Sequence, residues 1–303
     1  MIRPALLALL VLSTPAYAQD DQELSGSLLA ISARGAIRIG VRDDAVPFSF
    51  RNPGGQPVGF SVDICHGIAE DVATALHRDL LEPGAPGWQS GIRIAYVPVA
   101  ASERVQMVVA HAIDLECGST TANEERAKQV AFSPVFFVAG TKLAVPAGAA
   151  ISSWRDLAGK SIAVSAGTTN ETVLKRLAPT AKPPPEIVSL PSVEAAFDAL
   201  AANRVQAVGS DDILLAGMVA AKGGRFNVVG DYLSFEPYAI MLPRADPQFA
   251  ALVRDSFARQ AEAGLLRSGY NRWFLGKLPT GGSLNLSMGP QLAEIYRALG
   301  QPD

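Results

Sequence analysis

The chain has 303 residues, of which 49% are hydrophobic and 18% charged, and its net charge is −3. A chain of this length accommodates two domains or one large one, and this composition supports a packed core rather than a disordered chain. The sequence excludes recognition of nucleic acid through its phosphates, because it has neither a basic excess nor a run of basic residues.

The first 18 residues have the layout of a secretory signal. Arg3 provides the charged start, residues 5–12 form an apolar segment, and a small-x-small cleavage site ends at Ala18. The apolar segment is too short to cross a bilayer as a helix. We therefore expect cleavage after Ala18 and a soluble exported protein, whose compartment would be the periplasm if the source is a bacterium that has one.

Two cysteines, Cys65 and Cys117, follow the expected cleavage site. An oxidising periplasm permits a disulfide between them. Two buried free thiols are the alternative, because sequence spacing alone does not fix the geometry that a disulfide needs.

Predicted strands and helices alternate along the chain. The apolar patterns predict strands over residues 37–42, 92–97, 113–115, 141–145, 161–164, 205–208 and within 232–242. They predict helices over residues 27–34, 59–76, 102–109, 153–157, 170–177, 192–200, 212–221, 247–263 and 266–274, and one more that starts near 123. Residues 179–185 form a loop, and the tail from 281 onward packs back on the surface.

One strand–helix–strand pattern occurs twice. Ser102 begins a short amphipathic helix, and the next strand leads to Ser119. Ser192 begins a second such helix, and the next strand leads to Asp211. In open α/β sheets ligands bind beyond the carboxyl ends of the strands. The repeat therefore predicts two similar α/β lobes that direct strand ends toward a shared cleft.

Hydroxyl, guanidinium and carboxylate groups collect at these predicted strand ends and helix starts. Ser119, Thr120 and Thr121 precede the helix that carries Arg126, so hydroxyls, backbone N–H groups and a guanidinium could hold a carboxylate there. An ordinary helix cap beside a solvated arginine is the alternative. The complete set comprises Arg42, Ser102, Arg104, Ser119, Thr120, Thr121, Arg126, Ser165, Thr168, Thr169, Asp211 and Asp212.

This set of side chains suits the binding of a zwitterion. A guanidinium with hydroxyls binds a carboxylate, an acidic side chain binds an ammonium, and additional arginines suit a second carboxylate. The sequence lacks a Gly-x-Ser-x-Gly elbow, a phosphate-binding loop and metal-ligand spacing. We therefore expect a binding protein without cofactor, metal site or catalytic residue.

Taken in order, several short segments resemble those of bacterial extracellular solute-binding proteins of family 3, which serve the uptake of polar amino acids. The resemblance is greatest to glutamate/aspartate-binding proteins and extends from about residue 28 into the tail. It is carried by GVR (40–42), PFSF (47–50), GFSVD (59–63), DLECGSTT (114–121), ER (125–126), AFS (131–133), SAGTT (165–169), DD (211–212) and LLAG (214–217).

The resemblance implies a type II periplasmic-binding-protein fold. Each of its two α/β lobes would contain a mostly parallel sheet flanked by helices, and two crossover strands near 137–141 and 232–238 would join the lobes. Lobe 1 would comprise residues 27–139 and 235–303, and lobe 2 residues 140–234.

The resemblance also implies how the site binds the parts that all amino acids share. Arg126, with Ser119 and Thr121, matches the α-carboxylate site of the family. Thr168 or Thr169 would complete that site from lobe 2. These five residues would therefore contribute to the affinity for every amino-acid ligand.

Three charged residues complete the implied site. Asp211 matches the residue that takes the α-ammonium, and Arg42 and Arg104 match positions that hold an acidic side chain in glutamate/aspartate-binding proteins. Ser165 belongs to the same candidate set. A neutral ligand would leave Arg42 or Arg104 without a buried counter-charge, so we expect an acidic ligand.

Three positions depart from the pattern that this resemblance implies. Ser61 stands where the family usually has an acid, Ala101 where glutamate/aspartate-binding proteins commonly have a serine, and Val193 where they commonly have a histidine. Two neutral hydrogen-bond partners for the side-chain carboxylate of an acidic ligand are thus missing. Each hydrogen bond to a charged group contributes roughly 1.5–3 kcal/mol. Ser102 could replace the missing hydroxyl.

The function that the resemblance implies is the capture of L-glutamate or L-aspartate by hinge closure. A monomer would deliver the ligand to an ABC transporter through transient contact with the membrane permease. One alternative is a protein of the same fold that binds another amino acid or carboxylate. A dehydratase-type enzyme with Glu116 or Glu236 as general acid is another. A sensor without a transport role is the third.

Overall fold

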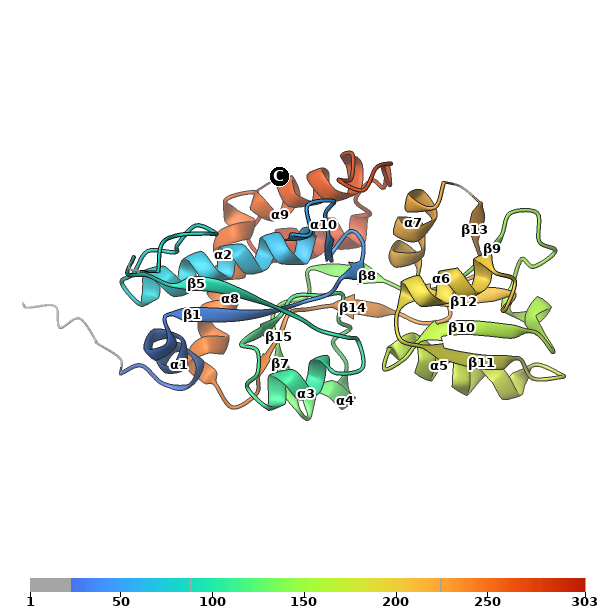
Figure 1. Cartoon of the computed structure of the whole chain (residues 1–303), viewed down its shortest axis with the longest axis horizontal. Helices are drawn as coiled ribbons and strands as arrows, with labels where there is room; N and C mark the ends of the chain where they lie inside the picture. Colours follow the sequence, from blue (N-terminus) through green and yellow to red (C-terminus); the bar gives the residue numbers. More distant parts are fainter. Residues whose placement is uncertain (1–22, 88, 224, 303) are drawn as a thin grey trace, which may run out of the picture.

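Two lobes lie next to each other, and each is built around its own five-stranded sheet (Figure 1). The computed structural model describes residues 23–302 except 88 and 224, so the expected signal, residues 1–18, lies outside the described residues. No helix in the described part of the chain is long and apolar enough to cross a membrane. The two-lobed α/β architecture agrees with the sequence-based prediction.

The sheet of the first lobe has the strand order β5-β1-β6-β15-β7. β1 (Ala36–Val41) pairs in parallel with β5 (Arg93–Pro98) and β6 (Leu115–Glu116). β15 (Met241–Pro243) runs antiparallel to β6 and to β7 (Val130–Phe132). The helices of this lobe are α1 (Gly26–Arg34), α2 (Phe60–Ala75), α3 (Arg104–Val109), α4 (Glu124–Ala127), α8 (Pro247–Glu262), α9 (Leu265–Tyr270), which continues as the π-helical turn Asn271–Leu275, and α10 (Pro290–Ala298).

The sheet of the second lobe repeats this arrangement in the order β11-β10-β12-β9-β13. β10 (Ser161–Ser165) pairs in parallel with β11 (Glu186–Leu190) and β12 (Ala207–Asp211). β9 (Thr141–Pro146) runs antiparallel to β12 and to β13 (Phe226–Val229). Its helical segments are the 3₁₀ turns Trp154–Leu157 and Ala178–Thr180 and the helices α5 (Thr169–Leu177), α6 (Val193–Ala201) and α7 (Asp212–Ala221).

Two crossover strands connect the lobes (Figure 1). β8 (Phe137–Ala139) carries the chain into the second lobe, β14 (Glu236–Tyr238) carries it back, and the two pair antiparallel. The returning chain enters the first sheet as β15, next to β6, in the antiparallel direction. Each sheet consequently contains a parallel half and an antiparallel half.

The cores of the two lobes differ in composition. In the first lobe, the ring of Phe48 lies 4.9 to 6.5 Å, between centroids, from five other aromatic rings. Large rings bury roughly 150–250 Å² each, so they dominate the apolar burial of this lobe. The core of the second lobe consists mainly of small and aliphatic side chains such as Ala163, Val208 and Leu215.

The C-terminal tail packs on the first lobe, as predicted. Leu292 and Tyr296 of α10 are buried in the same core as Phe48. The Tyr296 hydroxyl donates a hydrogen bond of 3.0 Å to the carbonyl oxygen of Phe136, the residue before β8. The tail is therefore attached next to the start of a crossover strand.

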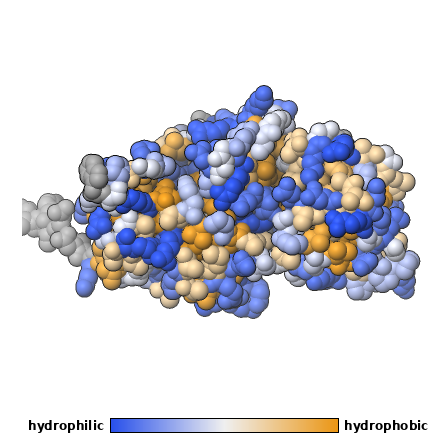
Figure 2. Space-filling model, viewed as in Figure 1, coloured by the Kyte–Doolittle hydropathy of each residue, from blue (hydrophilic) through white to orange (hydrophobic). Residues whose placement is uncertain are grey.

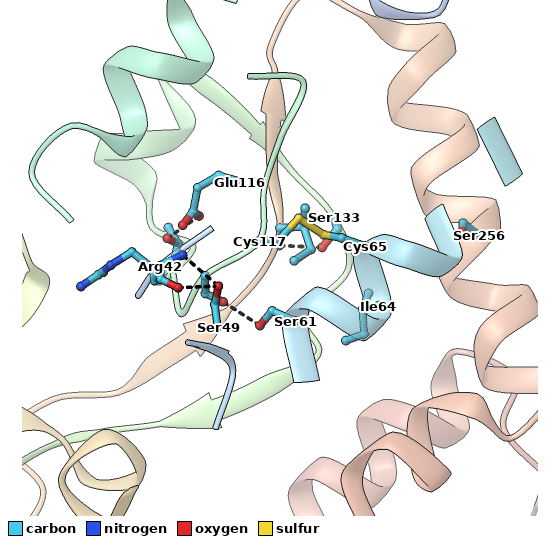
Figure 3. Close-up of a disulfide and its surroundings, with 12 residues drawn as sticks. Arg42, Ser49, Ser61, Ile64, Cys65, Glu116, Cys117, Ser133 and Ser256 are labelled. Carbon is cyan, nitrogen blue, oxygen red and sulfur yellow. Dashed lines mark hydrogen bonds between the residues drawn. A yellow bond between two sulfur atoms is a disulfide. The ribbon is translucent and has the colours of Figure 1, made fainter. Parts of the chain in front are cut away.

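A disulfide joins Cys65 in α2 to Cys117, the residue after β6 (Figure 3). Beside it, the Ser61 hydroxyl donates to the carbonyl oxygen of Gly118 at 2.7 Å. Both links tie the first turns of α2 to the segment that leads into the predicted hydroxyl cluster. Ser61 thus contributes to positioning this segment.

The sequence pattern missed two edge strands of the second lobe. β11 and β13 carry half-exposed side chains and lack the period-two alternation that marks a half-buried strand. The strand predicted within 232–242 is divided into β14 and β15, because residues 239–240 pass from the crossover pair into the first sheet. A small antiparallel sheet of β2 (Asp44–Ala45), β3 (Ser49–Arg51) and β4 (Pro57–Val58) follows β1.

Candidate ligand-binding site

A small enclosed cavity, with a volume of about 10 Å³, lies where the strand ends of the two lobes face each other. On the face shown in Figure 2, hydrophilic residues gather along the boundary between the lobes. The residues that line the cavity are Arg42, Arg104, Ser119 and Thr121 from the first lobe and Thr168, Thr169, Asn170, Val193, Ser210, Asp211 and Leu214 from the second. The backbone N–H of Val193 in the second lobe donates to Asp44 of the first at 3.1 Å. The hydroxyls of Thr121 and Thr169 lie 3.3 Å apart, so the lobes stand in a closed arrangement.

One end of the site is organised by Arg126. Its backbone N–H donates to the side chain of Asn123, the N-cap residue of α4, at 2.9 Å. Its guanidinium donates from Nη1 to the carbonyl oxygen of Thr121 at 2.8 Å and from Nη2 to that of Gly167 at 3.5 Å. Gly167 belongs to the second lobe, so this guanidinium reaches across the boundary between the lobes.

Glu236 of the crossover strand β14 connects hydroxyls of both lobes. Its Oε2 accepts hydrogen bonds from Thr121 at 2.7 Å and from Thr169 at 2.6 Å. Its Oε1 accepts one from Ser234 at 2.5 Å. Both oxygens of this buried carboxylate therefore accept hydrogen bonds from hydroxyl groups, which gives Glu236 a structural role between the lobes.

Asp211 is the buried carboxylate that the second lobe contributes. Its Oδ1 accepts from Asn170 Nδ2 at 2.7 Å, and its Oδ2 accepts from the hydroxyl of Tyr238 in β14. Burial, and next the negative charge of Glu236, raise the pKa of Asp211 to about 7. Burial and the charge of Glu236 both disfavour the ionised form of Asp211. A cation placed beside this carboxylate would stabilise the ionised form, which favours the binding of an ammonium group.

The arginines of the first lobe are buried and affect one another. Burial, followed by the charges of Arg126 and Arg42, lowers the pKa of Arg104 to about 9, and Glu116 opposes this shift. Burial also lowers the pKa of Arg126, against the charges of nearby carboxylates. Carboxylates of the chain offset part of the repulsion among these guanidinium groups, and the α-carboxylate of an amino acid would offset more of it.

Arg42 and Arg104 have counter-charges of their own. Nη2 of Arg42 lies 2.5 Å from Oδ1 of Asp44, and both side chains are buried. Nη1 of Arg104 donates to Thr120 Oγ1 at 2.6 Å, and Thr120 in turn donates to Oε2 of Glu116 at 2.6 Å. The expectation that a neutral ligand leaves an arginine uncompensated is therefore wrong for Arg42, which pairs with a residue two positions along the chain.

Seven of the nine predicted site residues line the cavity. Arg126 lines a neighbouring pocket of about 460 Å³, which also contains Thr121, Thr168, Thr169 and Glu236. Ser165 lines neither of these two pockets. It is 2% exposed, and its hydroxyl has no hydrogen-bond partner within the described part of the chain.

Several residues that complete the site lie outside the predicted set of nine. Asn170 contacts Asp211, and its position in the first turn of α5 was a usable signal. Asp44 lies two residues after Arg42, which ends a predicted strand, and this position was a second usable signal. Glu236 was named only as a candidate general acid, and the folded chain brings it to Thr121, 115 residues away in sequence.

The model of the family described as "Bacterial extracellular solute-binding proteins, family 3" matches residues 37–276. The chain belongs to this family.

Two curated relatives of this family 3 protein are similar over nearly its whole length. The glutamate/aspartate import solute-binding protein of Escherichia coli is 34% identical, with 97% of this chain and 94% of that protein covered. The protein of the same name from Salmonella typhimurium is 33% identical, with 98% and 96% covered. Both are binding proteins rather than enzymes, in agreement with the sequence-based expectation.

Solved structures of similar fold include an ancestral arginine-binding protein bound to arginine. It has a TM-score of 0.69 and 27% identity, with 80% of this chain and 99% of that chain covered. The family 3 protein therefore shares both its sequence pattern and its two-lobed fold with solute-binding proteins.

Proposed function

We propose that this family 3 protein captures an L-amino acid, L-glutamate or L-aspartate foremost, and delivers it to an ABC transporter. The observation that carries the proposal is the opposition of Asp211, from the second lobe, to the buried arginines of the first across one closed cavity. This arrangement offers a carboxylate to an ammonium and guanidinium groups to carboxylates. The named functions of the two curated relatives support it.

The part of the site that contacts the amino-acid backbone would lie between Arg126 and Asp211. Arg126, with the hydroxyls of Ser119 and Thr121, would bind the α-carboxylate, and Asp211 would bind the α-ammonium. Thr168 and Thr169 would complete the carboxylate site from the second lobe. Ser165 would hold that segment, since its carbonyl oxygen accepts from the Thr168 hydroxyl at 2.7 Å.

Arg42 and Arg104 would contact the ligand side chain. Both line the cavity on the side of the first lobe. Ala101 and Val193 are buried near them and offer no polar side chain. A carboxylate there would rely on the two guanidinium groups for its hydrogen bonds.

Binding would proceed by closure of two lobes, comprising residues 27–139 with 235–303 and residues 140–234. The ligand would first contact the arginines of lobe 1, and lobe 2 would then close over it. Contacts between the lobes, such as Thr121 to Thr169 at 3.3 Å, exist in the closed arrangement and stabilise it.

Export and delivery follow from the same proposal. Cleavage after Ala18 would release a soluble monomer into the periplasm, where contact with the permease would be transient. The family description as extracellular supports this location.

Calorimetric titration of ligand-stripped mature protein with L-glutamate, L-aspartate, L-glutamine and L-asparagine tests the proposal. We expect saturable binding with one site per chain, with the acidic amino acids among the ligands. D-glutamate serves as a matched control, because it misplaces the ammonium relative to Asp211. Absence of binding by all four L-amino acids would refute the proposed function.

A further inference from the structure

One carboxylate joins the two lobes beside the cavity. Asp44 lies in β2, and its side chain is 9% exposed. Its Oδ1 accepts from Arg42 Nη2 at 2.5 Å, and its Oδ2 accepts from the backbone N–H of Val193 at 3.1 Å. Arg42 and Val193 both line the cavity, whereas Asp44 lies behind them.

The group that Asp44 contacts in the second lobe is itself suited to an anion. Val193 is the first residue of the nine-residue helix α6, whose N-terminal N–H groups and dipole favour negative charge. The side chain of the N-cap residue Ser192 satisfies the N–H of Ala195, not that of Val193. Arg42 and this helix start thus form an anion site, and Asp44 fills it.

The charges around the cavity leave no positive excess for a second ligand carboxylate to neutralise, because three arginines face four carboxylates. Arg42, Arg104 and Arg126 face the carboxylates of Asp44, Glu116, Asp211 and Glu236, all of them largely buried. The α-ammonium and α-carboxylate of an amino acid add no net charge. An acidic side chain adds one further negative charge to a site that has no excess of positive charge, and an amide side chain adds none.

We propose that Asp44 is a positioning residue that sets the side-chain preference of this site. By neutralising Arg42 and occupying the start of α6, it removes most of the advantage that an acidic side chain would have over an amide. The remaining N–H groups of Arg42 can donate to a carboxylate or to an amide oxygen. This inference rests on the proposed function and specifies its ligand class as acidic and amide amino acids, bound with similar affinity in place of a marked preference for the acidic pair.

The test compares the ratio of the glutamine and glutamate dissociation constants in wild-type protein and in Asp44→Asn. In the wild type we expect the two constants to lie within about tenfold of each other. Asp44→Asn keeps an oxygen for the Val193 N–H but leaves Arg42 with an uncompensated charge. We expect the ratio to shift toward glutamate by at least about tenfold.

Asp43→Asn is a matched control, because it removes the same charge one residue away. Asp43 has a side chain that is 53% exposed and pairs with Arg51 rather than with a cavity residue. We expect this variant to keep the wild-type ratio. Asp44→Ser provides a second test of the same site, and we expect its ratio to shift in the same direction as that of Asp44→Asn.

Three results would overturn the inference. Equal weakening of both ligands in Asp44→Asn would show that Asp44 only supports closure. Selective weakening of glutamate would show that Asp44 orients Arg42 toward a ligand carboxylate. A wild-type preference for glutamate far above tenfold would show that Asp44 does not neutralise the site. Failure of the wild type to bind any amino acid would instead refute the proposed function on which the inference depends.

Discussion

The first lobe supplies the three buried arginines of the site, whereas the second supplies Asp211 and the hydroxyls of Thr168 and Thr169. The two sheets nevertheless share one order of parallel and antiparallel pairings. The topology therefore determines where side chains meet, and the residues at the strand ends determine what they bind. We infer that the first lobe recognises carboxylates before closure and that the second adds recognition of the ammonium on closure.

Loss of Arg126 should have the largest effect on binding, because it removes the guanidinium proposed to bind the carboxylate of every amino acid. We expect Arg126→Ala to weaken all amino-acid ligands by about 4 kcal/mol, as measured by calorimetry. Arg104→Ala is the matched comparison and should weaken binding less. Equal losses in the two variants would contradict the assignment of Arg126 to the shared carboxylate.

Loss of the disulfide should lower the stability of the first lobe and leave that of the second unchanged. Cys65 and Cys117 are 52 residues apart, and closing such a loop stabilises the folded state by about 4 kcal/mol. We expect the double variant Cys65→Ser, Cys117→Ser to lose about that free energy of unfolding, measured by urea denaturation. The loss should be confined to the first lobe, so hydrogen exchange in β10 and β12 should stay unchanged. An equal increase of hydrogen exchange in both lobes of the double variant would contradict this division.

Binding should depend on pH through the second lobe. The raised pKa of Asp211, about 7, means that part of the ligand-free protein carries a protonated carboxyl at neutral pH. An ammonium requires the ionised form, so affinity should fall as the pH drops below 7, by up to about tenfold per pH unit, and should level off above 7. Calorimetry in buffers of different ionisation enthalpy should detect proton release on binding.

Asp211→Asn is the control for this pH dependence. Its residual binding should be weak and should lose the dependence below pH 7, because the titrating carboxyl is gone. A pH profile that survives in this variant would assign the titration to another group.

The smallest effect should come from a single hydroxyl between the lobes. Thr169→Val keeps the side-chain volume but removes one of the hydrogen bonds to Glu236, and it should weaken binding by about 1 kcal/mol. Thr121→Val removes the hydrogen bond from the other lobe. The double variant should show coupling between the two sites, because both hydroxyls share one oxygen. If the losses of binding free energy in the two single variants add up to that of the double variant, Glu236 does not link the lobes.

Much of the fold was predictable because local patterns agree with it. Gly35 ends α1, Asn123 caps α4, and α7 spans residues 212–221 as its apolar pattern predicts. The arginines and hydroxyls at strand ends were identifiable, because carboxyl ends of parallel strands share an edge. The edge strands β11 and β13 were not, since their exposed positions carry no regular pattern.

The partners of these site residues could not be predicted from local patterns. Asp44 meets the backbone of Val193 across 149 residues of sequence, and Glu236 meets Thr169 across 67. Such pairs depend on closure of the lobes and on the return of the chain through β14. Their charges decide the electrostatic balance of the site, so the preferred ligand is harder to predict than the class of binding protein.

The return of the chain into the first sheet also bears on how the molecule is assembled. All strands of the second sheet lie in one continuous segment, from β9 to β13, whereas the first sheet needs β15, and its core needs α8 and α10, from the last quarter of the chain. A chain that emerges from its N-terminus can complete the second lobe while the first is still missing a strand. The three arginines would then acquire their final surroundings last, only after the C-terminal helices have arrived.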